Sequence, residues 1–250
     1  MISIKNLKKI FLSNNRNQPV VVFDDFSCEF KYGSITAILG TSGSGKSTLG
    51  RIISGLETEY EGEVIINGKN ISNYLKEKRI GVVPQKYANF EWMNVYENIT
   101  LDKLDKEYAE VILKRLGLEE YVNFYPRELS GGLQQRVAVA RALFYKSEIV
   151  IFDEPFGGLD EDTRLKVLEF VQPILKEMNI TGIFITHKIE EALYVADRVV
   201  VFSQKPVSIV YDIQTPVIIR NRDFYFNDSI LKLKKELLKT LFNKGNYENI

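Results

Sequence analysis

Residues 40 to 47 read Gly40-Thr41-Ser42-Gly43-Ser44-Gly45-Lys46-Ser47, which satisfies the pattern G-x-x-x-x-G-K-[ST]. The apolar run Ser34 to Leu39 before it predicts a strand, and Thr48 to Ser54 after it has the pattern of a helix. Glycines let the backbone turn tightly so that consecutive N–H groups converge, and the following helix adds its positive end. This stretch, together with Thr48, is therefore predicted to wrap the phosphates of a nucleotide.

The pattern assigns a role to each of the last two side chains of the loop. Lys46 is expected to neutralise the β- and γ-phosphates of ATP, and the Ser47 hydroxyl to bind Mg²⁺. The alternative is a glycine-rich turn that matches by chance. The strand expected before the loop and the helix expected after it argue against that alternative.

Short apolar runs alternate with helical stretches over most of the chain, which favours an α/β fold with several strands buried on both faces. The expected strands are Val20 to Phe23, Ser34 to Leu39, Glu63 to Ile66, Ile80 to Val83, Glu148 to Asp153, Gly182 to Thr186 and Arg198 to Phe202. The pattern changes between Gln85 and Phe144, where the segments with helical spacing are Asn94 to Leu104, Lys106 to Leu116 and Gly131 to Phe144. We interpret this region as a helical insert.

Composition excludes several classes of protein. Lys and Arg together number 33, as do Asp and Glu, so the formal net charge is +0 and no global field attracts nucleic acid. The single cysteine, Cys28, excludes an internal disulfide and indicates a reducing compartment, the cytoplasm. No apolar run reaches the roughly 18 residues that span a bilayer, and Met1 to Leu7 does not resemble a signal peptide.

Two polar segments have simple structural interpretations. Ser13 to Gln18 ends at Pro19 and is expected to form a loop between two early strands. Asp228 to Phe242 places Ile230, Leu233, Leu237 and Leu241 on one helical face, with Lys232, Lys235 and Lys239 elsewhere. We expect this amphipathic helix to pack on its own domain; a role at a membrane surface is the alternative.

Two adjacent carboxylates, Asp153 and Glu154, end the apolar strand that begins at Glu148. Sheets of α/β proteins bind their ligands at the carboxyl ends of the strands. Neighbouring side chains of a strand point in different directions, so Asp153 is expected to act on the metal through its water shell. Glu154 is expected to reach the water that attacks the γ-phosphate, as a general base or a positioning group.

The stretch Leu129 to Arg136, Leu-Ser-Gly-Gly-Leu-Gln-Gln-Arg, resembles the signature of the ABC ATPases. Ser130 has the character of an N-cap, and Gly131 and Gly132 would let a ligand approach the start of the helix. The resemblance implies a P-loop NTPase (RecA-like) core, an antiparallel β subdomain and an inserted α-helical subdomain at about 86–145. It also implies that this helix end meets the γ-phosphate held by another subunit, so two copies form a dimer.

The resemblance extends to further motifs in the same order along the chain. Gln85 matches the glutamine that touches magnesium and the attacking water, and Gly158-Leu159-Asp160 resembles the loop that crosses between subunits. His187, the only histidine, matches the residue that contacts the γ-phosphate and orders the catalytic water. Phe11 is expected to stack on the adenine. The ABC ATPase domain is predicted at 1–212, followed by an extension at 213–250.

Weaker marks resemble bacterial importers of the nitrate, sulfonate and taurine group, among them Trp92 to Val95 and Pro155 to Asp160. Such importers imply a transmembrane permease, an extracytoplasmic solute-binding protein and a place on the cytoplasmic face of the cell membrane. The sequence departs from the group at several positions after the glutamine and in the signature, namely Lys86, Tyr87, Asn94 and Leu133. These departures bear on the permease and its cargo.

Three functions compete at this point. The first is an ATP hydrolase that drives uptake of a small solute, with ATP and Mg²⁺ as its cofactors. The second is a soluble ABC switch acting on the ribosome or nucleic acid, against which the balanced charge and single ATPase domain argue. The third is a subunit that binds ATP without turnover, which the presence of Glu154 and His187 disfavours.

Overall fold

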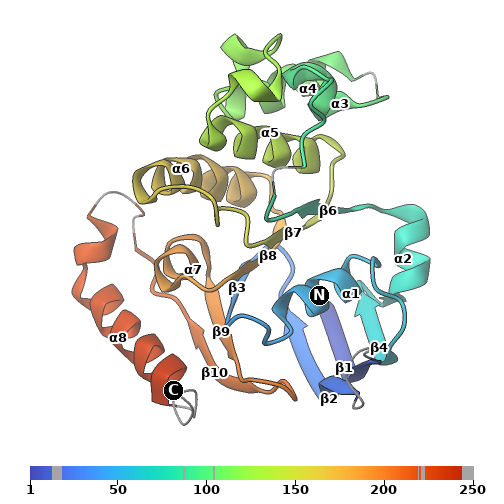
Figure 1. Ribbon diagram of the computed structural model, residues 1–250, viewed down its shortest axis with the longest axis vertical. Coiled ribbons are helices and arrows are strands. Elements are labelled where there is room, and N and C mark those ends of the chain that lie inside the picture. The colour runs from blue at the N-terminus through green and yellow to red at the C-terminus, as the bar shows by residue number, and fades with distance from the viewer. Residues whose placement is uncertain (13–18, 87, 104, 219, 221–222, 244–250) are drawn as a thin grey trace.

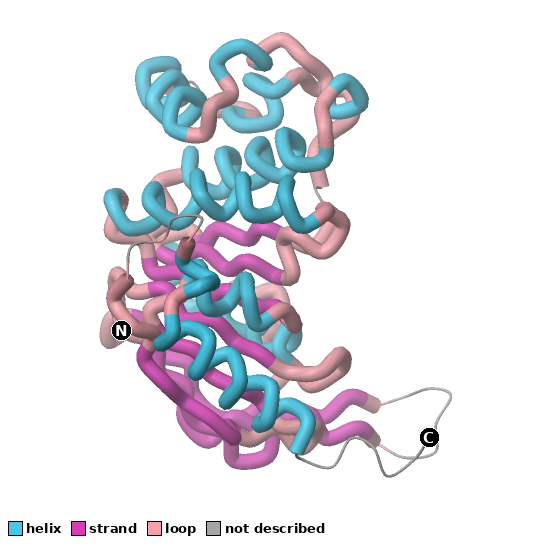
Figure 2. Tube along the Cα trace, turned by 90° about the vertical axis from the view of Figure 1, so that its left-hand side faces the viewer, coloured by secondary structure: helices cyan, strands magenta, loops and turns pink. Residues whose placement is uncertain are grey.

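Two sheets and a layer of helices build the chain (Figure 1). The computed structural model describes residues 1–12, 19–86, 88–103, 105–218, 220 and 223–243. The expected loop at Ser13 to Gln18 and the departure at Tyr87 lie outside the described residues. Seen from the side, helices lie at the top and the strands of both sheets lie below them, with further helices running across the strands in the lower half (Figure 2).

The larger sheet has six strands in the order β10-β9-β3-β8-β7-β6. Its strands are β3 (Ile35–Leu39), β6 (Ile80–Val83), β7 (Ile149–Asp153), β8 (Thr181–Thr186), β9 (Arg198–Phe202) and β10 (Ile209–Gln214). Every pair is parallel except β9 with β10. The loops that follow β3, β6, β7, β8 and β9 therefore meet at one edge of the sheet.

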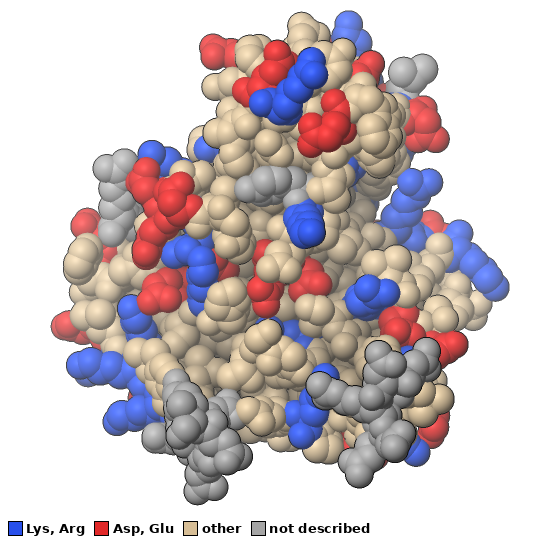
Figure 3. Space-filling model, in the orientation of Figure 1, with Lys and Arg blue, Asp and Glu red and all other residues tan. Residues whose placement is uncertain are grey.

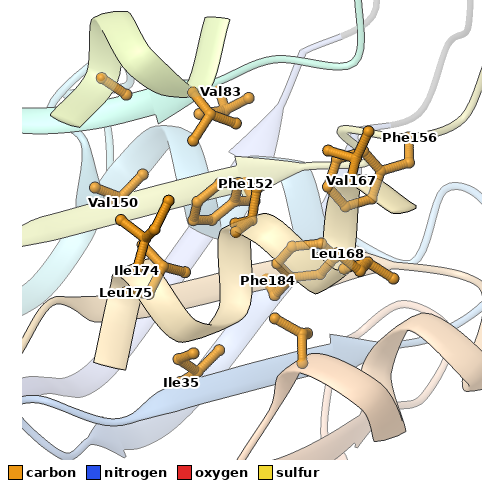
Figure 4. Close-up of a cluster of buried hydrophobic side chains, with 14 of the residues drawn as sticks. Ile35, Val83, Val150, Phe152, Phe156, Val167, Leu168, Ile174, Leu175 and Phe184 are labelled. Atoms are coloured by element: carbon orange, nitrogen blue, oxygen red, sulfur yellow. The ribbon is translucent and has the colours of Figure 1, made fainter. Parts of the chain in front are cut away.

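Side chains of the parallel strands alternate between two apolar cores. On one face, Phe152 of β7 and Phe184 of β8 stack with ring centroids 5.2 Å apart and meet Leu168 of α6 (Glu161–Glu177), as Figure 4 shows. On the other face, Ile151 and Ile185 belong to a second core. Continuous β-branched and aromatic runs suit strands that are covered on both sides.

The second core joins the larger sheet to an antiparallel sheet of order β2-β1-β4-β5. Its strands are β1 (Ile2–Phe11), β2 (Val20–Phe30), β4 (Glu61–Ile66) and β5 (Lys69–Asn70). The helices α1 (Lys46–Ile53) and α2 (Ile71–Glu77) contribute Leu49, Ile52, Ile53 and Ile71 to the same core. The antiparallel subdomain that the resemblance implied is therefore present.

Helices occupy the region between β6 and β7. They are α3 (Val95–Thr100), α4 (Lys106–Arg115), the 3-10 turns η1 (Glu119–Tyr121) and η2 (Pro126–Glu128), and α5 (Gly131–Phe144). The expected helix Asn94 to Leu104 is wrong at its end, because Leu101 adopts φ 50° and stops α3 at Thr100. Asn94 instead caps the helix, and its side chain accepts a hydrogen bond from Glu97 N.

The last helices pack on the same face of the larger sheet as α6. The short α7 (Ile189–Val195) follows β8, and α8 (Asp228–Asn243) follows the 3-10 turn η3 (Phe224–Phe226). Ile230, Leu233 and Leu237 are buried in the core that α7 shares, so α8 packs on its own chain as expected. Lys234 and Glu190 join the two helices by an ion pair of 2.6 Å.

All expected strands are present, and the α/β fold is confirmed. The strands β5 and β10 were not predicted, and β1 was expected only as a strand of unstated bounds before the loop at Ser13 to Gln18. The boundaries 86–145, 1–212 and 213–250 remain predictions. Among the described residues no helix is long and apolar enough to cross a membrane. Cations and anions are interspersed over the face shown in Figure 3.

Candidate nucleotide-binding site

The loop between β3 and α1 has the backbone that a phosphate-binding turn needs. Gly45 precedes the first helical residue, Lys46, with φ 97°, a conformation that side chains rarely adopt. A Cβ atom at this position would also lie 2.8 Å from Val22 Cγ1 and 3.0 Å from Val207 Cγ2. Glycine is therefore required here both by the turn and by the packing around it.

The loop lines a cavity of about 310 Å³. Its lining comes from four separate loops at the carboxyl edge of the larger sheet. The lining residues are Ser42, Gly43, Ser44, Gly45, Lys46, Ser47, Thr48, Gln85, Glu154 and Lys205. Most of the nucleotide residues expected from the sequence are thus gathered in one place.

Lys46 is held inside the loop. Its Nζ atom donates hydrogen bonds to the carbonyl oxygens of Gly40 and Thr41, at 2.9 Å each. Burial lowers the pKa of this amine, and the nearby carboxylates of Glu154 and Asp153 oppose that effect. Lys46 also lines the cavity, so its amine lies beside the space in which a phosphate would bind.

Ser47 and Asp153 come together from α1 and β7. The Ser47 hydroxyl donates a hydrogen bond of 2.7 Å to Asp153 Oδ1. Burial raises the pKa of Asp153, while the bond from Ser47 lowers it. Oxygen donors of this kind suit Mg²⁺, which takes one or two carboxylates and completes its shell with water and phosphate. The described residues hold no cluster of three or more His, Cys, Asp or Glu that could bind a metal alone.

Glu154 turns away from Asp153 because its backbone leaves the strand. Its φ is 47°, and its N–H donates to the carbonyl of Ile185 at 2.9 Å. The Oε2 atom of Glu154 lies 3.5 Å from Gln85 Nε2 and 3.3 Å from His187 Nδ1. The three residues expected to act on the attacking water therefore meet at a single carboxylate oxygen.

The signature residues lie elsewhere. Ser130 caps α5, accepting a hydrogen bond of 3.4 Å from Leu133 N. Gly131 and Gly132 begin the same helix, and none of the three lines the cavity. Within one chain the signature and the phosphate loop are separate.

Phe11 also lies outside the lining of the cavity. It ends β1, is 40 % exposed and has Lys9 Nζ 4.6 Å from its ring centroid. The ring is partly exposed, and its stacking on the adenine stays a prediction.

Lys205 lines the cavity and was missed by the sequence reasoning. It lies in the turn between β9 and β10, where Val207 N donates to Val22 O at 2.9 Å. The turn is fixed against the phosphate loop because Val207 is buried beside Gly45. The sequence gives one indication of this turn's role. Like the other loops of the site, the turn with Lys205 follows a strand of the larger sheet.

Comparison with known proteins gives consistent matches. The family model described as ABC transporter matches residues 23–157. The aliphatic sulfonates import ATP-binding protein SsuB of Bacillus cereus is 38% identical over 213 residues, 83% of each chain. The sulfate/thiosulfate import ATP-binding protein CysA of Escherichia coli is 40% identical over 216 residues, 81% of this chain and 58% of that protein.

Solved structures give the same fold. The dimeric structure of a bacterial ABC transporter cassette superposes with a TM-score of 0.74 and 28% identity, covering 87% of this chain and all of that one. A structure described as the post-hydrolysis state of the same ATP-binding cassette, bound to ADP and Pi, matches to the same extent.

Proposed function

This chain belongs to the ABC transporter family, and we propose that it is the ATP-hydrolysing subunit of a membrane importer, two copies of which close around two ATP molecules. The observation that carries the proposal is the meeting of Lys46, Ser47 and Glu154 in one cavity. Similar curated proteins are import ATP-binding proteins, so the switch acting on ribosomes or nucleic acid is not favoured.

The phosphates bind in the loop. Residues 42–48 line the cavity, and the N-terminus of α1 adds its partial positive charge there. Lys46 leaves the carbonyls of Gly40 and Thr41 for the β- and γ-phosphates. Lys205 supplies a second cation from the opposite wall, and Phe11 stacks on the adenine.

The oxygen atoms of Ser47 and Gln85 and, through water, Asp153 would hold magnesium. The Ser47–Asp153 hydrogen bond of 2.7 Å brings two of these oxygen donors together. When bound, Mg²⁺ neutralises charge that develops on the phosphate oxygens. The carboxylate of Asp153 lies at the end of β7, where it accepts a hydrogen bond from the Ser47 hydroxyl.

Hydrolysis depends on Glu154. Its carboxylate accepts a proton from the attacking water, or orients that water in line with the γ-phosphate. Gln85 and His187 lie within 3.5 Å and 3.3 Å of Glu154 Oε2 and fix the direction in which it points. His187 contacts the γ-phosphate with the face of the imidazole that remains exposed.

A second copy completes each site. Ser130, Gly131 and Gly132 present the N-terminus of α5, a position that favours an anion, yet they lie outside the cavity of their own chain. The matching cassette forms a dimer, which supports the same arrangement here. The loop Gly158 to Asp160 crosses between the copies.

The remaining partners follow from the importer assignment. A permease binds beside the segment after Gln85, where Trp92 is 73 % exposed, and an extracytoplasmic protein delivers the solute. The chain then works at the cytoplasmic face of the membrane. The names of the relatives point to a small sulfur oxyanion as cargo, a sulfonate or sulfate.

Purification from membranes tests this function. A tagged chain is expected to recover a polytopic permease together with ATPase activity. The Lys46→Ala variant should recover the same permease but bind ATP about 10- to 150-fold more weakly, because it loses a charge-assisted contact worth ~1.5 to 3 kcal/mol. Recovery with ribosomes or DNA and never with a permease would contradict the importer assignment.

A further inference from the structure

The first turn of α6 contacts the inter-subunit loop Gly158 to Asp160, the signature at the start of α5, and the helix α7. Its N-cap is Asp160, whose side chain accepts a hydrogen bond of 3.0 Å from Thr163 N. Thr163 packs against the signature, since a Cβ on Gly132 would lie 2.7 Å from Thr163 Cγ2. One residue further along, Arg164 reaches α7, the helix that follows His187.

Arg164 and Glu191 form an ion pair inside the protein. Their side chains are 7 % and 3 % exposed, and Arg164 Nε lies 3.4 Å from Glu191 Oε1. Arg164 Nε nevertheless donates no hydrogen bond among the described residues. A small approach of α6 toward α7 would form that bond, so the pair is sensitive to the spacing of the two helices.

Glu191 is also hydrogen-bonded to the segment that contains His187. Its Oε2 atom accepts a hydrogen bond of 2.5 Å from Thr186 Oγ1, and the same hydroxyl accepts from Lys188 N at 3.0 Å. The residues on both sides of His187 are therefore tied to Glu191. A change in the position of Glu191 must move the backbone that holds the imidazole.

We propose that Arg164 and Glu191 are positioning residues that couple the signature and inter-subunit loop of a chain to the switch histidine of its own ATP site. When the partner's ATP engages Ser130 to Gly132, α5 moves the first turn of α6, and the buried pair transmits that movement to His187. The two ATP sites of a dimer are thereby linked. This inference rests on the proposed function.

The discriminating variant removes both charges of the pair without leaving one buried alone. Arg164→Met combined with Glu191→Gln keeps an amide that can still accept from Thr186. We expect ATP affinity within about twofold of wild type, because the phosphate loop is untouched, but a kcat about tenfold lower, within the range that coupling residues produce. In a Glu154→Gln background, ATP-dependent dimerisation should weaken as well.

Lys176→Met is the matched control. Lys176 pairs with Asp197 at the other end of α6, away from all three motifs. It should leave kcat and dimerisation unchanged. All assays are run well below the melting temperature of each variant, so that unfolding of the protein does not lower the measured kcat.

Three outcomes overturn the inference: a kcat within twofold of wild type in the double variant, an equal loss in Lys176→Met, or a loss of kcat that follows a loss of ATP affinity. If the double variant does not fold, Glu191→Gln alone and Arg164→Lys are judged by the same criteria. Wild-type protein that fails to hydrolyse ATP would instead overturn the proposed function.

Discussion

The Nδ1 atom of His187 lies 3.3 Å from the Oε2 atom of Glu154, although the two residues follow different strands. Asp153 pairs in register with Ile185, so β7 and β8 end side by side and deliver both side chains to one point. Gln85 reaches the same oxygen from the end of β6. The site depends on this sheet edge more than on any single loop.

Replacing Glu154 by Gln should abolish turnover while preserving ATP binding. The amide keeps the shape of the side chain and can still face His187, but it accepts no proton. General-base groups contribute about 10²- to 10⁴-fold to rate, so kcat should fall by at least about 100-fold. Steady-state phosphate release and equilibrium ATP binding measure the two effects, and size-exclusion chromatography with ATP and Mg²⁺ should reveal a trapped dimer. Wild-type turnover would exclude this role for Glu154.

Most of the candidate site could be predicted from sequence because each motif directly follows an apolar strand. The phosphate loop follows β3, Asp153 and Glu154 end β7, and His187 follows β8. Lys205 could not be found in this way, since a lysine in a polar turn looks like any solvated lysine. Only the packing of Val207 beside Gly45 places that turn at the cavity.

Lys205→Ala should weaken ATP binding by up to about fivefold, because an exposed cation near phosphate contributes up to about 1 kcal/mol. Lys205→Arg should restore affinity, and Lys31→Ala, outside the cavity, should have no effect. In Lys205→Ala, the affinity for AMP should fall less than the affinity for ATP, because AMP carries less negative charge. Titration of each nucleotide at two salt concentrations checks the electrostatic origin, since the difference should shrink at high salt. Equal affinities of wild type and Lys205→Ala would exclude the contact.

The first strand shows why the bounds of an expected strand could not be predicted. Lys5, Lys8 and Lys9 make β1 look polar, yet Lys9 is only 3 % exposed. Its Nζ atom pairs with Glu57 at 3.1 Å, and Glu57 is distant in sequence. A tertiary ion pair thus makes a buried position compatible with lysine, which local periodicity does not reveal.

Cys28 should react slowly with thiol reagents in the folded protein. Burial raises the pKa of its thiol to about 12, and the carboxylates of Glu29 and Asp212 add to this, while Arg198 opposes it. At pH 8 only about 10⁻⁴ of the thiol is then ionised, against roughly a quarter for a free cysteine. Because the thiolate is the reactive form, labelling should rise about tenfold per pH unit toward pH 12. Spectrophotometric thiol titration in buffer and in urea measures the difference, and equal rates would contradict it.

Sharing of the ATP site between two copies predicts complementation between two inactive variants. Lys46→Ala removes the phosphate contact of its own chain, and Ser130→Arg blocks the signature that serves the partner's ATP. Each variant alone should hydrolyse little ATP. In an equal mixture, half of the dimers are mixed, and each of these contains one site with Lys46 and Ser130 both intact. Activity should therefore recover up to about a quarter of the wild-type value, given a symmetric two-fold dimer.

Differently tagged variants, captured through both tags in sequence, isolate the mixed dimers for this assay. Thermal unfolding of Ser130→Arg is measured beside it, because loss of the N-cap of α5 should cost about 1 kcal/mol. Recovery in the mixed dimers shows that one shared site can work, whereas no recovery shows that both sites must be intact. Wild-type turnover by Ser130→Arg alone contradicts sharing altogether, since a chain that hydrolyses ATP by itself has no need of its partner's signature.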